Sequence, residues 1–265
     1  MTQKENHYSL LNSEAYTASG LIGSGLTMLR KMDFSRETYF SQSLFSLSIG
    51  LERLMKLIII YDYRYSNEGN FPSNEYLKHQ IGHNLTKLYS NIKCIAARFE
   101  KDRLFNEVDA DPICTKILSI LTDFAMNSRY YNLDQLSQAK SVGKNPINEW
   151  EEFVNDHIVK RHFKISSNTI EKPTVTNPNN AKSNEERMQI VTINNLQNSF
   201  YHGQFIEVKA KYSMFYMYKI IRAICSVTNF PEFYIFPILS DHFAIFMNED
   251  DRYVLSKKAW DNYRP

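Results

Sequence analysis

The segment Tyr39–Tyr63, YFSQSLFSLSIGLERLMKLIIIYDY, carries the clearest helical pattern in the sequence. Its main apolar residues recur at steps of four or three: Phe40, Leu44, Leu47, Leu51, Leu54 and Ile58. This spacing puts them on one face of an α-helix, whereas Gln42, Ser46 and Arg53 fall away from that face. Such a helix is about 35–40 Å long. The pattern therefore predicts the central helix of a helical bundle.

The composition favours helices over the rest of the chain as well. Only 8 Gly and 8 Pro occur among 265 residues, whereas an all-β sandwich needs frequent turn signals. A hydrophobic content of 43% is enough for a substantial core. The sequence predicts an all-α fold in three parts: a helical bundle over residues 1–165, a linker or mobile loop over 166–184, and a mostly helical C-terminal region over 185–265 that packs on the bundle.

Capping residues predict where the helices of the bundle begin. Asn12 or Ser13 can begin the first helix, which runs to about Met32, and Ser35 can begin the second. Small residues in the first helix, including the run Gly23–Gly25, predict close packing between helices. This GSG run does not follow a strand, so it does not fit a dinucleotide-binding fingerprint.

Three further helix starts are predicted in the middle of the chain. Asn84 can begin a helix that runs to about Phe99. Asp111-Pro112 and Asn145-Pro146 each place an N-cap residue before a proline at the first helical position.

The pattern is weaker after the linker. Helical signal returns over about 184–198 and again over 209–228, with a turn expected at Tyr201–Gly203. Residues 230–265 are aromatic-rich and are compatible with short helices or with strands.

Charge and cysteine usage restrict the class of protein. The net charge of +2 gives no argument for nucleic-acid binding from bulk charge, so an anion site must be a local patch. The three cysteines are far apart and form no CxxC pair, which disfavours disulfides and cysteine zinc sites. The N-terminal residues have no apolar core of a secretory signal, and the longest apolar run, Leu57–Ile60, is too short to span a membrane. We therefore expect a cytoplasmic protein with no membrane association, no metal and no cofactor.

The order of segments resembles that of one known family. A helix of small residues is followed by the long helix with Glu52, Arg53 and Lys56, by a proline-containing loop, and by the run Gly82–Leu85, GHNL. This order is similar to the HEPN superfamily of all-helical proteins. The run Ser128–Asp134, SRYYNLD, also resembles a segment of some prokaryotic members. The resemblance covers roughly residues 10–165.

The resemblance implies a bundle that often dimerises. Many HEPN proteins are metal-independent ribonucleases of toxin–antitoxin or anti-phage defence systems, and others are non-catalytic subunits. Their active site combines a His with an Arg a few residues upstream, where His transfers a proton and Arg holds the phosphate. None of the seven His residues of this chain has an Arg five to seven positions before it. The nearest variants are Lys78 before His83 and Gln197 before His202.

Several residues are therefore candidates for function, each with a structural alternative. The candidate catalytic residues are His83, Arg129 and His202. The candidate residues for binding RNA or nucleotide are Glu52, Lys56, Tyr130, Asn132, Lys160 and Arg161.

The alternatives are specific to each group. His83 can contact a phosphate or can fix its own loop by a hydrogen bond. Glu52 and Lys56 can form an exposed pair on the helix, or Glu52 can face the bundle and pair with His83 or Arg129. Arg129 and its neighbours can hold a nucleotide or cap the preceding helix, and the basic run at 157–164 can contact phosphates or be a solvated face.

Three functional hypotheses follow. The first is a HEPN-like protein of a prokaryotic anti-phage defence or toxin system that acts on or binds RNA or nucleotide. The second is a non-catalytic interaction or regulatory subunit that forms a homodimer or controls a partner protein. A third, weaker hypothesis is a sensor that binds a small nucleotide between helices.

Overall fold

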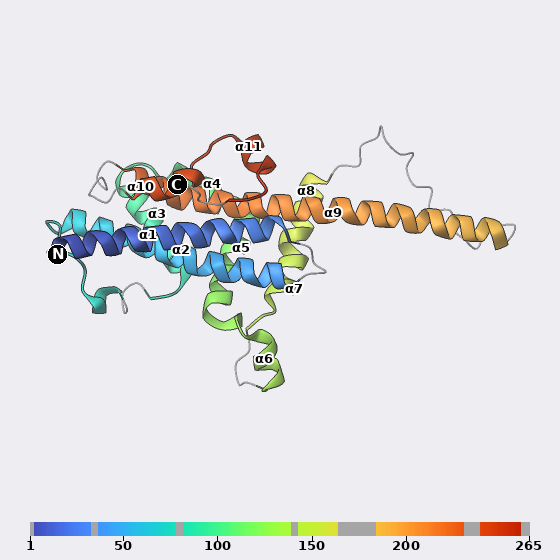
Figure 1. Ribbon diagram of the computed structural model, residues 1–265, viewed down its shortest axis with the longest axis horizontal. Coiled ribbons are helices and arrows are strands. Elements are labelled where there is room, and N and C mark those ends of the chain that lie inside the picture. The colour runs from blue at the N-terminus through green and yellow to red at the C-terminus, as the bar shows by residue number, and fades with distance from the viewer. Residues whose placement is uncertain are drawn as a thin grey trace.

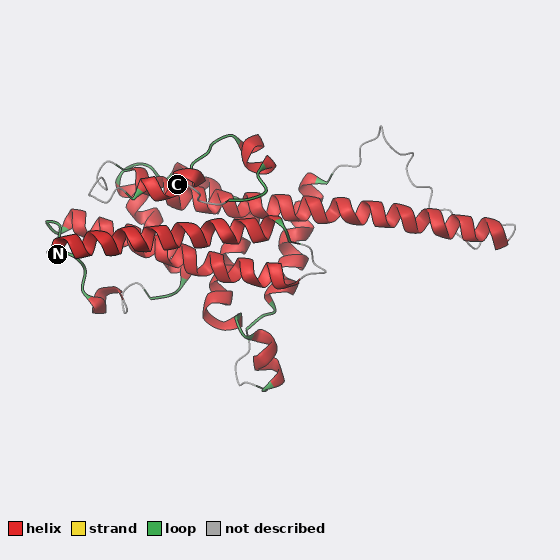
Figure 2. Cartoon of the chain, viewed as in Figure 1, coloured by secondary structure: helices red, strands yellow, loops and turns green. Residues whose placement is uncertain are grey.

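The computed structural model describes residues 3–32, 37–77, 82–138, 143–163, 184–230 and 239–260, without the side chains of 3–6 and 184–202. Every regular element within these residues is helical (Figure 2). The predicted all-α fold class is therefore confirmed. Among the described residues, none of the helices combines the length and the apolar character needed to cross a membrane.

The helices before residue 164 form much of the body of the bundle, and one of them projects from it (Figure 1). The first group is α1 (Gln3–Arg30), α2 (Glu37–Ser66), α3 (Leu85–Arg98), α4 (Arg103–Asp109) and α5 (Pro112–Asp123). The second group is the π-helical turn η2 (Phe124–Ser128), α6 (Tyr131–Leu136), α7 (Pro146–Glu149), the π-helical turn η3 (Trp150–Asn155) and α8 (Asp156–His162).

The elements after residue 183 begin with a very long helix. They are α9 (Asn184–Ser226), the 3₁₀ turn η5 (Val227–Asn229), α10 (Ser240–Phe243), the 3₁₀ turn η7 (Ala244–Phe246) and α11 (Asp251–Ser256). Figure 1 shows α9 running beside α1 and then extending beyond the end of the bundle.

The apolar stripe of the long helix is buried as predicted. Each of its six residues, from Phe40 to Ile58, is at most 2% exposed in α2. The small residues of α1 let the two helices approach closely: a Cβ atom on Gly25 would lie 2.5 Å from Cγ of Leu47. Ser43 of α2 donates a 2.9 Å hydrogen bond to the Gly25 carbonyl at the same place. The predicted close helix packing is thus confirmed.

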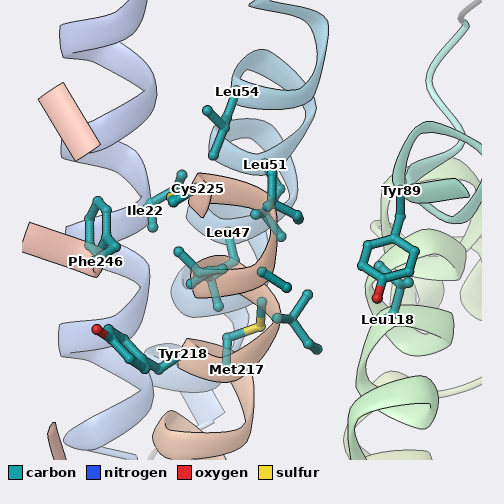
Figure 3. Packing of buried hydrophobic residues seen from close by; sticks show 14 of the residues in the cluster. Ile22, Leu47, Leu51, Leu54, Tyr89, Leu118, Met217, Tyr218, Cys225 and Phe246 are labelled. Carbon is teal, nitrogen blue, oxygen red and sulfur yellow. The ribbon is translucent and has the colours of Figure 1, made fainter. Parts of the chain in front are cut away.

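The C-terminal half of α9 completes the same core. Figure 3 shows Met217 and Cys225 of α9 clustered with Ile22 of α1 and with Leu47 and Leu51 of α2. The C-terminal tail also packs on α1, where the Trp260 backbone N–H donates to Oγ1 of Thr27 at 2.9 Å. The exact division of the chain near residue 165 stays a prediction.

Three predicted helix starts are confirmed by their caps. The Asn84 side chain accepts a 2.8 Å hydrogen bond from the backbone N–H of Lys87. Asp111 and Asn145 accept from backbone N–H groups two residues later, at 3.0 Å in both cases, and each is followed by its proline.

Two predicted boundaries are wrong. The first helix begins at Gln3 and not at Asn12 or Ser13. Leu11 and Ala15 are buried, so the apolar contact begins before the expected cap, and the Asn12 side chain instead bonds His242 of the tail at 2.8 Å.

The expected turn at Tyr201–Gly203 is also absent, because α9 continues through it. A glycine inside a helix costs only about 1 kcal/mol, which is too little by itself to end a helix. The Ser35 cap lies outside the described residues. So do residues 166–183 of the predicted linker, while Asn184 begins α9. The described part of the ambiguous tail forms short helices.

Candidate functional site

His83 is presented at the start of α3. The preceding Gly82 has a positive φ of 61°, a backbone conformation that glycine adopts without strain. Asn84 then caps the helix. The His83 side chain is 75% exposed, and its Nδ1 lies 2.8 Å from Oε1 of Glu52 on α2. An exposed imidazole is therefore fixed on one edge by the protein and open to solvent on the other.

Glu52 links His83 to a cation. Nζ of Lys56, one turn later on α2, lies 2.8 Å from the same carboxylate oxygen. The side chains of Glu52 and Lys56 are only 22% and 24% exposed. Of the partners expected for an inward-facing Glu52, the structure places His83 beside it and not Arg129.

The direction of the hydrogen bond between His83 and Glu52 follows from the chemistry of the two groups. An ionised carboxylate only accepts hydrogen bonds, so Nδ1 of His83 is the donor toward Glu52. In the neutral imidazole, Nε2 then carries the free lone pair. A His held in this way by a carboxylate can accept a proton at Nε2, and the carboxylate stabilises the imidazolium that forms.

A pair of threonines holds the start of α3 against α5. The Thr86 backbone N–H donates to Oγ1 of Thr122 at 3.1 Å, and the two hydroxyls are 2.8 Å apart. The position of His83 thus depends on contacts from α2 and α5 as well as on its own cap.

Arg129 lies in a separate pocket. It follows the π-helical turn η2, and its guanidinium carbon lies 4.9 Å from the centre of the Phe45 ring on α2. A pocket of about 280 Å³ opens here, and its lining includes Phe45, Ser128, Arg129, Tyr130, Asn132 and Asn145. Oγ of Ser128 and Nε of Arg129 are buried, and neither has a hydrogen-bond partner among the described residues. This pocket therefore has unused donors beside aromatic rings.

The two groups are neighbours along α2. Phe45 precedes Glu52 by seven residues, or two helical turns, so both lie on nearly the same face. The separation along the axis is about 10 Å, which is short compared with an oligonucleotide. The described contacts of Arg129 include neither His83 nor Glu52.

No family model, no curated protein and no solved structure matches this chain. The HEPN resemblance noted from the sequence therefore stays an expectation.

The basic run of α8 is already paired with protein carboxylates. Nζ of Lys160 lies 2.7 Å from Asp156, and Nη1 of Arg161 lies 3.0 Å from Asp111. Arg161 also donates to the Tyr216 hydroxyl at 2.9 Å, and this hydrogen bond raises the pKa of the guanidinium. Both cations thus have partners within the protein, and their predicted role in binding RNA stays a prediction.

His162 belongs to the same network, which the sequence did not reveal. Its ring stacks on Tyr212 of α9 at 3.6 Å between centres, and Nε2 lies 2.7 Å from the Tyr216 hydroxyl. Burial, with a smaller contribution from Arg161, lowers the pKa of His162. These contacts fasten α8 to α9.

His202 lies in the continuous helix α9, and its side chain is outside the described residues. Phe45, Ser128 and Asn145 also line the Arg129 pocket, and the sequence does not predict this position for any of them. A signal for Phe45 was present, because an aromatic residue two turns before Glu52 shares its helix face.

Proposed function

We propose that this chain is a HEPN-like protein of a prokaryotic anti-phage defence or toxin system that binds RNA or nucleotide and cleaves RNA without a metal. The observation that supports RNA cleavage is the exposed imidazole of His83. Glu52 holds this imidazole, and the same carboxylate contacts Lys56. The assignment to defence or toxin systems is supported by the sequence resemblance.

The residues match the needs of cleavage by an internal nucleophile. The 2′-hydroxyl of a ribose gives its proton to Nε2 of His83, and its oxygen forms a bond to the adjacent phosphorus. The bond from phosphorus to the 5′-oxygen breaks, and that oxygen takes a proton from water. The Lys56 ammonium lies next to the imidazole's carboxylate partner and offsets the negative charge of the phosphate.

The Arg129 pocket supplies the complementary binding groups. The guanidinium has unused hydrogen-bonding capacity for a phosphate, and Tyr130, which is 61% exposed, offers a ring for base stacking. The Asn132 amide in the same lining can bond base edges. An RNA strand that spans about 10 Å of α2 would contact both groups.

Removal of the Arg129 guanidinium is expected to weaken RNA binding. Arg129→Ala should raise the Kd for a labelled single-stranded RNA about tenfold, the effect of losing a charged hydrogen bond of about 1.5 kcal/mol. Fluorescence anisotropy in EDTA measures this change. Arg53→Ala is the control, because Arg53 lies on the outer part of α2 and pairs with Glu14. Equal Kd values for the two variants, or no binding by the wild type, would contradict the assignment of this pocket.

A second candidate function, a dimerising regulatory subunit, is favoured by α6. This helix projects from the bundle (Figure 1), and none of its residues is buried. Leu133 and Leu136 are 62% and 82% exposed, and Met126 nearby in the chain is 52% exposed. Exposed apolar side chains on a projecting helix are typical of protein interaction surfaces.

Charges on α6 are expected to break a homodimer. The wild type should have the mass of a dimer in light scattering, and Leu133→Glu with Leu136→Glu should give a monomer, because a buried unpaired carboxylate is costly. Leu10→Glu is the control, since Leu10 of α1 is also highly exposed. A monomeric wild type, or a variant that stays dimeric, would exclude α6 as the dimer contact.

A further inference from the structure

Arg64, in the last turn of α2, is a buried arginine outside the site described above. It is 7% exposed, and its guanidinium carbon lies 4.6 Å from the centre of the Phe71 ring and 6.0 Å from that of Tyr61. Nε donates a long hydrogen bond of 3.4 Å to the Gly69 carbonyl. Nη1 is buried and has no partner among the described residues. The charged end of the side chain is therefore poorly compensated.

The other buried arginine of the described residues has a carboxylate partner, which Arg64 lacks. Arg30 of α1 is 8% exposed, and both of its terminal nitrogens bond the two carboxylate oxygens of Glu207. Arg64 has no such carboxylate in the part of the chain that the structure describes. Arginine stays charged in proteins, and a buried charge without a counter-charge is costly. An anion from outside the chain would remove that cost.

Arg64 lines a pocket of the size that small ligands occupy. The pocket has a volume of about 610 Å³ and lies between the start of α1 and the loop after α2. His7, Tyr8, Asn70 and Phe71 share its lining with Arg64. Ligand pockets usually measure about 300–1,000 Å³ and combine aromatic walls with a few polar groups. The volume lies in this range, and Tyr8 and Phe71 are the aromatic residues of a lining that is otherwise mostly polar.

One carboxylate also lines the pocket. Glu68 is exposed and is held at a positive φ of 52°, and no described ion pair joins it to Arg64. Its charge opposes an anion, but solvent screens it more strongly than it screens the buried guanidinium. The net electrostatic potential close to the Arg64 guanidinium is therefore positive.

We propose that this pocket binds a small molecule through an oxyanion, a phosphate or a carboxylate, that pairs with the Arg64 guanidinium. The Asn70 amide and the His7 imidazole supply further donors, and Phe71 and Tyr8 contact the organic part of the ligand. Arg64 follows Glu52 by twelve residues, or about 18 Å along α2, so this site is distinct from the RNA site and does not depend on it.

Titration calorimetry of the full chain with sodium phosphate and, separately, with sodium acetate tests this proposal. Sodium chloride at matched ionic strength corrects for salt effects. The wild type is expected to bind at least one of the two anions saturably. Phosphate binding alone identifies a phosphate ligand, whereas acetate binding identifies a carboxylate. Arg64→Gln should weaken binding about tenfold or more, as expected for loss of a charged hydrogen-bond partner. Arg53→Gln on the same helix should leave binding unchanged.

Two further variants keep the test decisive if Arg64→Gln does not fold. Asn70→Ala should weaken binding, and Glu68→Gln should strengthen it because a like charge is removed. Both residues are exposed, so neither change disturbs the core. No saturable binding by the wild type, or unchanged affinity in all three pocket variants, would overturn the proposal. His83→Ala should retain the anion site even if it abolishes RNA cleavage.

Discussion

Replacement of Trp150 by Ala is expected to lower the free energy of unfolding by about 3–5 kcal/mol. Trp150 lies in η3 and is fully buried. Its ring meets that of Phe40 on α2 edge-on, with 5.2 Å between centres. Its Nε1–H donates to Oγ of Ser213 on α9 at 3.2 Å. The indole thus joins three elements, and its loss leaves a cavity that cannot collapse without moving one of them.

Urea denaturation followed by far-UV circular dichroism measures this loss. Trp150→Phe should cost less, because the variant keeps most of the apolar contact and loses only the hydrogen bond, worth about 1 kcal/mol. Leu10→Ala is the control, since an exposed side chain on α1 should change stability by no more than about 0.5 kcal/mol. A Trp150→Ala loss below about 1 kcal/mol would show that η3 does not hold α2 and α9 together.

The parts of the fold that depend on local pattern could be predicted from the sequence. The stripe of α2 required only helical spacing, and the caps Asn84, Asp111 and Asn145 required only the pairing of a side-chain acceptor with nearby N–H groups. The long α9 could not be predicted in one piece, because Gly203 is a local signal for a break. The modest cost of a glycine inside a helix did not end α9, whose described buried residues begin only at Ala210.

The candidate site can be predicted from the sequence only in part, because its contacts join elements that are distant in the sequence. For Glu52 the sequence leaves open an exposed pair with Lys56, a contact with His83 or a contact with Arg129, because it does not show which face of α2 meets α3. The neighbourhood of Arg129 and Phe45 depends on the π-helical turn η2, which shifts the residues after it relative to an α-helix. In the sequence, Arg64 has the pattern of an ordinary cation at a helix end. It is buried in part because the loop after α2 places the Phe71 ring against its guanidinium.

Loss of the His83 imidazole is expected to reduce RNA cleavage at least about a hundredfold. General acid–base groups contribute about 10²–10⁴-fold to a rate, and Ala provides no substitute for Nε2. Glu52→Gln keeps a group beside Nδ1 but removes the negative charge that stabilises the imidazolium. Its rate should therefore lie between those of the wild type and His83→Ala.

A second histidine provides the matched control for this prediction. His157 bonds the Phe153 carbonyl through Nδ1 at 2.8 Å and stacks on the Phe153 ring. It lies on α8 and has no described contact with Glu52 or Arg129. His157→Ala should cleave RNA at the wild-type rate. Similar losses in both histidine variants would point to general destabilisation, which thermal unfolding of the same samples would reveal.

The cleavage rate of a labelled single-stranded RNA in EDTA, with wild type and His83→Ala purified in parallel, tests the central claim most directly. We expect the wild type to cleave the RNA and His83→Ala to reduce the rate by about two orders of magnitude or more. RNA that stays intact with the wild type at high protein concentration would contradict the account. An equal cleavage rate in the two proteins would contradict it as well.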